Sequence, residues 1–187
     1  MILTLIALVI LLISVGGMLR ATDTSTSIVG NLAFRRDLTN RAEIAIAAAK
    51  AQLNSGLVFS SSARESDNSL ANYSATRLAP PPGAGAMGVP HVLISDNEYT
   101  AALYTCIPAS CTAGTDGVLL RWVIDRQCTA GTTTFTTAAC GYVNTTKDAG
   151  GTNFLKKPTG ASRGLFRISV RVSGPRNTEA YIQTTAG

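Results

Sequence analysis

The chain begins with a long uncharged run, in which residues 1–19 carry no acidic or basic side chain and are mostly apolar. A helix of that length reaches roughly 28 Å at about 1.5 Å per residue, close to the ~30 Å hydrocarbon core of a bilayer. No basic residue precedes the run and no small-residue cleavage site ends it, unlike a secretory signal. The pattern therefore predicts a retained apolar helix that can cross a membrane.

A second helical pattern, amphipathic this time, occupies residues 28–54. Gly16, Gly17 and the Thr- and Ser-rich stretch at 22–27 favour helix poorly, so a single helix in two halves with a weak joint is predicted. Asn54-Ser55-Gly56 predicts its C-terminal end. The apolar positions of the second half recur every three or four residues: Phe34, Leu38, Ala42, Ile46, Ala49 and Leu53.

Beyond the helix, the apolar positions change to a period of two, which predicts strands. Residues 118–125 place Leu120, Trp122 and Ile124 on one face, and residues 166–172 alternate apolar side chains with Arg167, Ser169 and Arg171. A turn at 174–177 leads into residues 178–184 and closes an antiparallel hairpin. Shorter strands are predicted at 91–95 and 99–105, around an Asp96-Asn97 turn.

The connection between helix and strands contains Ala79-Pro80-Pro81-Pro82-Gly83-Ala84-Gly85-Ala86, which is incompatible with regular structure. Residues 60–90 are therefore predicted to form a long surface loop. The fold class expected is α+β, with a long N-terminal helix (1–54) packed on an antiparallel sheet in a single head of residues 55–187. The apolar faces of the strands need a cover, and the amphipathic half-helix supplies one.

Composition adds cross-links to this picture. The chain has 187 residues, of which 14% are charged and 6% aromatic, enough for one modest head. That head is rich in Thr, Ser, Gly and Ala, so its core is thin and covalent bridges would help it. Four cysteines allow three pairings, and short loops favour Cys106 with Cys111 and Cys128 with Cys140. A zinc site is the competing interpretation, but the chain has no Cys-x-x-Cys and a single histidine, His91.

Candidate chemistry is sparse, and an enzyme, a cofactor or a bound metal is not expected. There is no phosphate-binding glycine loop, no Ser-centred elbow and no metal-ligand pair. His91 is interpreted as a surface residue at a strand entry, and Asp96, Asn97 and Glu98 as a solvated turn rather than a cation site. Asn72-Tyr73-Ser74 and Asn144-Thr145-Thr146 match the glycosylation acceptor pattern.

Basic residues gather near the C-terminus, with no acid between Asp148 and Glu179. Arg167 and Arg171 share the presumed outer face of a strand, where they would attract DNA phosphates, an acidic surface or an acidic face of another subunit. The competing interpretation is a solvated sheet face whose charges prevent aggregation. The predicted basic face consists of Lys156, Lys157, Arg163, Arg167, Arg171 and Arg176.

The sequence resembles the type IV pilin class, and within it the PilX-type minor pilins. The resemblance lies in Arg20 to Thr26 (Arg-Ala-Thr-Asp-Thr-Ser-Thr), in the Gly-Asn-Leu-Ala-Phe-Arg element at 30–35, and in a closing strand ending at 171–178. It implies a filament subunit whose oily helices pack in the centre of a fibre while the heads form its wall. The residues expected in this assembly helix are Ile2, Leu5, Ala7, Leu8, Leu12, Val15, Gly16 and Gly17.

One departure from the family bears on the role. Main pilins carry a glutamate at the fifth mature position, whereas this chain has Leu5 and no acid before Asp23. The alternatives are therefore a low-copy tip or priming subunit that displays an adhesin or binding head, a type II secretion pseudopilin, or an anchored binding module that never polymerises.

The partners implied are copies of the same chain or other pilins, with surface or DNA contact as a further candidate. The resemblance implies storage in the inner membrane of a Gram-negative bacterium and then an extracellular pilus. Basic residues follow the oily run, whereas the cysteines suggest an oxidising compartment, so a short basic leader is expected to set orientation.

Overall fold

The computed structural model describes residues 2–85, 88–132, 134–144, 162–175 and 178–187, apart from the side chains of Gly17, Leu19, residues 21–24, Ser27 and Ile28. The chain forms two compact units, Met1–Leu38 and Thr39–Gly187. The first helix, α1, runs from Ile2 to Asn54 and so contributes to both units. Each unit is described by itself below.

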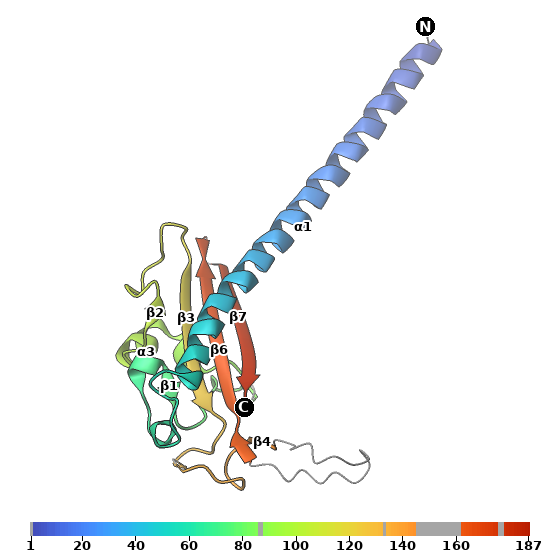
Figure 1. The fold of residues 1–187 in the computed structure, drawn as a ribbon. Coiled ribbons are helices and arrows are strands. Elements are labelled where there is room, and N and C mark those ends of the chain that lie inside the picture. The colour runs from blue at the N-terminus through green and yellow to red at the C-terminus, as the bar shows by residue number, and fades with distance from the viewer. Residues whose placement is uncertain (1, 86–87, 133, 145–161, 176–177) are drawn as a thin grey trace, which may run out of the picture. The chain divides into compact units, whose positions relative to one another are not determined.

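Helix α1 is continuous from Ile2 to Asn54, so the prediction of a weak joint at Gly16-Gly17 and residues 22–27 is wrong (Figure 1). A glycine costs about 1 kcal/mol in a helix interior, and β-branched threonines cost less. A long hydrogen-bonded ladder tolerates such losses, because propagation is favourable once the helix has nucleated.

The second unit contains the last turns of α1 and all of the described strands. In chain order its elements are η1 (Ser62–Glu65), η2 (Ser69–Ala71), β1 (Tyr73–Ser74), α2 (His91–Ile94), α3 (Asp96–Ala101), β2 (Cys106–Ile107), β3 (Leu119–Arg126), β4 (Tyr142–Asn144), β5 (Ser162–Gly164), β6 (Phe166–Gly174) and β7 (Thr178–Ala186).

The main sheet has the order β1-β3-β6-β7, with β2 also paired to β3, while β4 and β5 form a separate two-stranded sheet. The predicted hairpin is present, since β6 pairs antiparallel with β7 from Phe166↔Ala186 to Gly174↔Thr178. The sheet is mixed rather than wholly antiparallel as predicted, because β1 runs parallel to β3. Strand β7 lies at the end of this order and pairs only with β6 among the described strands.

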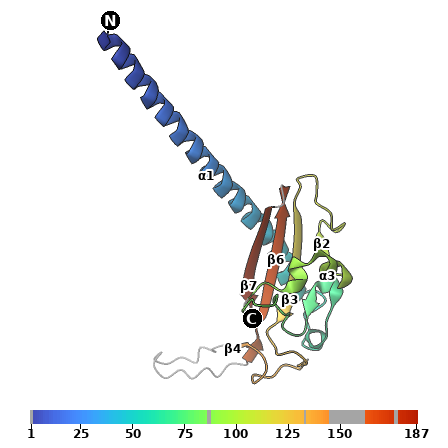
Figure 2. The ribbon, with the colours of Figure 1, turned by 180° about the vertical axis from the view of Figure 1, so that it is seen from behind.

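One face of the sheet is covered by the C-terminal turns of α1, which lie in front of the strands in Figure 1 and behind them in Figure 2. Its residues Ala42, Ala45 and Ala49 are fully buried, and such small side chains let a helix approach a sheet closely. The strand residues that alternate onto the predicted apolar face are buried as well: Leu120, Trp122, Ile124, Phe166, Ile168, Val170 and Val172.

The other face of the sheet is also covered, by the short helix α2, which packs on β3 and β6. The strands predicted at 91–95 and 99–105 are wrong, because α2 and α3 occupy most of this region. Ser95 caps α3 by accepting a hydrogen bond from the Glu98 backbone N–H at 3.4 Å, and Asp96 and Glu98 lie in the first turn. Ser95-x-x-Glu98 is thus the capping pattern that the period-two interpretation overlooked.

The predicted surface loop at 60–90 is wrong in its middle part, where Ala71 to Ala75 are buried. Asn72 adopts a left-handed conformation, with φ 49°, that turns the chain from η2 into β1. Its side-chain amide lies within hydrogen-bond distance of the Thr105 and Trp122 carbonyls, both at 2.7 Å, and its oxygen accepts from the Thr105 N–H at 2.7 Å. Asn72 is therefore a buried polar hub and is closed to glycosylation in the folded chain.

A buried ion pair joins β3 and β6. Asp125 is directly opposite Arg167, whose Nε and Nη2 donate to the two carboxylate oxygens at 2.9 and 2.7 Å. Arg167 also donates to the Gly88 and Leu78 carbonyls at 3.1 and 3.2 Å, and the Leu78 N–H donates back to Asp125 at 3.1 Å. The pair thereby fixes both the register of the two strands and the connector that crosses them.

Two further arginines are opposite each other, since Arg121 on β3 faces Arg171 on β6. Like charges in this position repel. Asp96, at the start of α3, accepts hydrogen bonds from both guanidinium groups, and Glu179 on β7 accepts another from Arg171. Partial burial of Asp96 opposes its ionisation, but the bonds from Arg121 and Arg171 prevail and hold its pKa below the ordinary value.

The structure contains disulfides between Cys106 and Cys111 and between Cys128 and Cys140, the pairing that the short loops favour. All four sulfurs are consequently unavailable as zinc ligands. The first bridge begins in β2 and closes part of the connection from β2 to β3, and the second closes the loop just beyond the end of β3. Loop closures of this size contribute on the order of 2–3 kcal/mol each by restricting the unfolded chain.

We predict that Arg167→Met lowers the free energy of unfolding of the sheet-containing unit by about 3–5 kcal/mol, because the Asp125 carboxylate is left buried without its cation. Arg77→Met is the matched control, since Arg77 is exposed, and should change stability by less than about 0.5 kcal/mol. Urea unfolding in neutral detergent, followed by fluorescence of Trp122, measures both variants. A loss below about 1 kcal/mol for Arg167→Met would contradict the assignment.

The depressed pKa of Asp96 predicts acid sensitivity with a definite sign. Its contribution to stability is present above the ordinary carboxyl pKa of about 3.9 and is lost as pH falls through the lower pKa of the folded state. Because the Asp96 side chain is 61% exposed and its ion pairs are screened by solvent, Asp96→Asn should lower stability by no more than about 1 kcal/mol at pH 7, and the deficit should shrink toward pH 3. Urea unfolding at several pH values tests this, with the exposed Glu43→Gln as control. A pH-independent deficit would refute it.

Candidate functional site

The N-terminal part of α1 presents apolar side chains to solvent on all of its sides. The assembly residues predicted from the sequence, Ile2, Leu5, Ala7, Leu8, Leu12, Val15 and Gly16, are all exposed, and the side-chain position of Gly17 lies outside the described part. A helix that is apolar all round, rather than on one stripe, is typical of a bundle centre or a membrane span. The large exposed side chains are Ile2, Leu3, Leu5, Ile6, Leu8, Val9, Ile10, Leu11, Leu12, Ile13, Val15 and Met18.

The polar serine inside this run is satisfied within the helix. The Ser14 hydroxyl donates to the Ile10 carbonyl, one turn earlier, at 2.8 Å. This local bond removes the cost of transferring a hydroxyl out of water without a partner. At Gly16, a side-chain carbon would meet no atom within 4 Å in the single chain, so nothing within the chain requires glycine there.

Over the residues that the structure describes, no helix is long and apolar enough to cross a membrane. The membrane-spanning role predicted for residues 1–19 stays a prediction.

The predicted basic face does not exist as an exposed stripe on β6. Arg167 and Arg171 are 3% and 8% exposed, and each is engaged by carboxylates and backbone carbonyls beneath α2 and its flanking loops. The sequence interpretation took one face of the strand as solvated, whereas both faces are covered. Arg163 is exposed, and Lys156, Lys157 and Arg176 lie outside the described residues.

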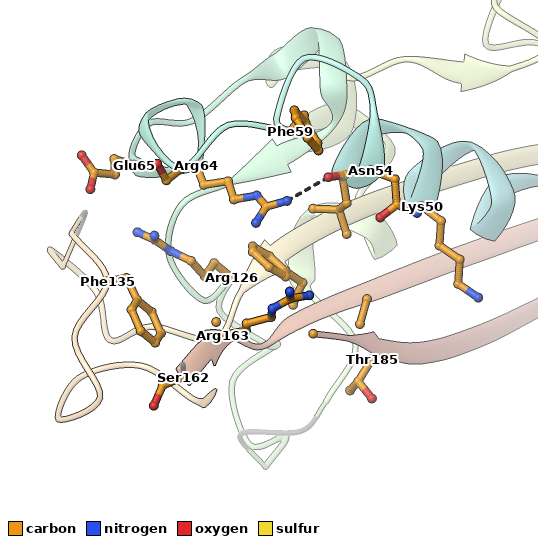
Figure 3. Close-up of a pocket in the computed structure, with 16 residues that line it drawn as sticks. Lys50, Asn54, Phe59, Arg64, Glu65, Arg126, Phe135, Ser162, Arg163 and Thr185 are labelled. Carbon is orange, nitrogen blue, oxygen red and sulfur yellow. Dashed lines mark hydrogen bonds between the residues drawn. The ribbon is translucent and has the colours of Figure 1, made fainter. Parts of the chain in front are cut away.

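A cationic cavity of about 700 Å³ lies in the sheet-containing unit, beside the C-terminal end of α1 (Figure 3). Among the described residues, it is lined from four elements by the cationic side chains Lys50 (α1), Arg64 (η1), Arg126 (β3) and Arg163 (β5), and by the acidic side chain of Glu65. In the view of Figure 3, Lys50 and Glu65 lie at opposite ends. The remaining lining residues are Leu53, Asn54, Phe59, Ser61, Phe135, Ser162, Gly164, Phe166, Thr185, Ala186 and Gly187.

Arg64 is held in place by the end of the helix. Its Nη2 donates to the Leu53 carbonyl at 2.8 Å and its Nε to the Val58 carbonyl at 2.9 Å. The guanidinium also lies 5.1 Å from the centre of the Phe166 ring, within the range of a cation–π contact. Arg64 thereby satisfies backbone carbonyls at the negative end of the helix dipole.

The cations of the cavity are close enough to influence one another. Burial lowers the pKa of Arg64, Tyr73 opposes this effect, and the charges of Arg163 and Arg126 lower it further. Arg126 is buried and its Nε donates to the Ala75 carbonyl at 3.0 Å. Arg163 is exposed and makes no hydrogen bond or ion pair with the described part of the chain. Positive charge is thus concentrated around the cavity. Arg64 and Arg126 are held by backbone carbonyls, and Arg163 is exposed.

Of the charged residues that line the cavity, the sequence analysis singled out Arg163 alone, and for a different surface. Arg64 and Arg126 are 62 positions apart, and no sequence pattern links them to Lys50 or to each other. The other residues considered as ligands are engaged elsewhere. His91 Nδ1 lies 2.8 Å from Glu98 Oε2, and Asp96 bridges Arg121 and Arg171.

Comparison with known proteins assigns no family to this chain: no family model, no curated protein and no solved structure matches it.

Proposed function

We propose that this protein is a structural subunit of a type IV pilus-like extracellular filament, which assembles through its apolar N-terminal helix. The observation that carries the proposal is the all-round apolar surface of α1 between Ile2 and Met18. Each such side chain gains about 1.5–3 kcal/mol when it leaves water. A helix with twelve of them exposed requires an apolar environment, and copies of the same helix supply one.

The organisation of the chain supports the same role. The last turns of α1 belong to the sheet-containing unit, whereas the apolar side chains of its N-terminal unit are exposed. The Ser14 hydroxyl, bonded to the Ile10 carbonyl, needs no water in a dry helical core. The resemblance at residues 20–26 and 30–35 to PilX-type pilins favours a fibre over a simple anchor. Before assembly, the same segment would be stored in the inner membrane.

A low-copy tip or priming subunit is the second candidate, and one observation favours it. Position 5 is an exposed leucine, so a neighbour's N-terminal ammonium would find no carboxylate there. A subunit with nothing above it does not need that pairing. The number of copies per unit length of purified filament separates a repeated subunit from a terminal one.

We predict that Leu12→Arg or Ala7→Arg abolishes assembly, because a charge in a dry helical core costs several kcal/mol, or roughly a thousandfold or more in association. Filament yield is measured by electron microscopy of sheared cell-surface material. Ser66→Arg adds the same charge at an exposed head position and should leave the yield unchanged.

Resistance to protease and intact disulfides in the variants would show that the head still folds. Normal filament yield from Leu12→Arg and Ala7→Arg would remove the assembly-helix proposal.

A further inference from the structure

We propose that the cationic cavity between α1, η1, β3 and β5 binds an uncharged sugar, a ligand that combines hydroxyl groups with an apolar C–H face. Free oligosaccharides and the terminal residues of a surface glycan share this chemistry. The site is separate from the assembly helix, because every residue that lines the cavity belongs to the sheet-containing unit.

The first argument is an accessible aromatic ring. Phe59 lines the cavity and is 60% exposed, so much of its surface can be contacted by a ligand (Figure 3). Its backbone is held on both sides, because Val58 is fully buried and the Val58 carbonyl accepts from Arg64 Nε at 2.9 Å. The Phe59 N–H also donates to the Gly56 carbonyl at 3.3 Å. A ring that is fixed in this way attracts the C–H groups of a sugar to its negative face.

The second argument is the mixture of hydrogen-bonding groups. Arg64 uses Nε and Nη2 for backbone carbonyls, which leaves Nη1 without a partner among the described residues. The side chains of Asn54, Glu65 and Arg163 also line the cavity and make no hydrogen bond within the described part of the chain. The cavity therefore offers guanidinium donors, a carboxylate acceptor and an amide that does both. A sugar hydroxyl both donates and accepts, so it can pair with each of these groups.

The third argument separates a sugar from other small ligands. An anion would share the cavity with the Glu65 carboxylate, whereas an uncharged ligand does not depend on the net charge of the lining. A wholly apolar ligand would cover the polar side chains without giving them hydrogen-bond partners, which is costly. A ring with hydroxyls at its edge and C–H groups on its face suits both the polar groups and Phe59. The cavity volume of about 700 Å³ is typical of small-molecule sites.

The test is binding of the fluorescently labelled full chain to an array of immobilised glycans, in a neutral detergent whose head group contains no sugar. Wild type should bind uncharged glycans equally well at low and high salt, because no net charge is neutralised. Binding confined to sulfated or sialylated glycans, or no binding at all, would overturn the proposal. Inhibition by the free disaccharide of the bound terminus would support a free sugar as ligand, and a requirement for the longer chain would support a surface glycan.

Phe59→Ala should weaken binding about tenfold, which corresponds to the loss of one aromatic contact, and Phe59→Tyr should retain it. Leu57→Ala is the matched control, because Leu57 is 51% exposed on the same segment but does not line the cavity. It should bind as wild type does. Urea unfolding of Phe59→Ala should match wild type, which separates loss of the site from loss of the fold. Unchanged binding by Phe59→Ala, or equal weakening by both alanine variants, would contradict the assignment.

Glu65→Gln shows whether charge or hydrogen bonding governs the ligand. Glutamine keeps an acceptor oxygen at this exposed position, so binding of uncharged glycans should change by less than about threefold. A gain of about tenfold or more would show that removal of negative charge controls binding, as for an anionic ligand, and would refute the sugar site.

Discussion

The head depends on the buried pair between Asp125 and Arg167. An ion pair removed from water is tolerated only when its remaining lone pairs and protons are satisfied, and here the connector supplies the carbonyls of Leu78 and Gly88 and the N–H of Leu78. The same contacts that satisfy the charges therefore hold the connector over the second face of the sheet. Register between β3 and β6, and burial of both strands, follow from one local requirement.

That second layer explains where the sequence predicted the fold and where it did not. Strict alternation at 166–172 predicted a strand correctly, but it also suggested that Arg167 and Arg171 face water. Arginine counts as a polar residue whether its guanidinium is hydrated or ion-paired. The alternation of apolar and polar residues therefore cannot distinguish a strand face exposed to solvent from one covered by charged contacts. The short helices in this region were missed, because Ser95 and Glu98 indicate a helix start only if a helix as short as α3 is considered.

The two candidate sites differ in how far the sequence could predict them. The apolar helix is local, and its composition alone singles out residues 1–19. The cationic cavity is assembled from α1, η1, β3 and β5, so its residues meet only because β3 and β6 bring distant segments together. Arg64 is the clearest example: its place follows from the carbonyls at the end of α1, a contact that no spacing rule contains.

Strand β7 has nine residues and a neighbour on one side only among the described strands. It contains no proline and no lysine, and its one charged residue, Glu179, is engaged by Arg171. The devices that usually protect a sheet edge are therefore missing along most of its length. The outer edge of β7 is therefore a place where one more strand could pair with the described sheet.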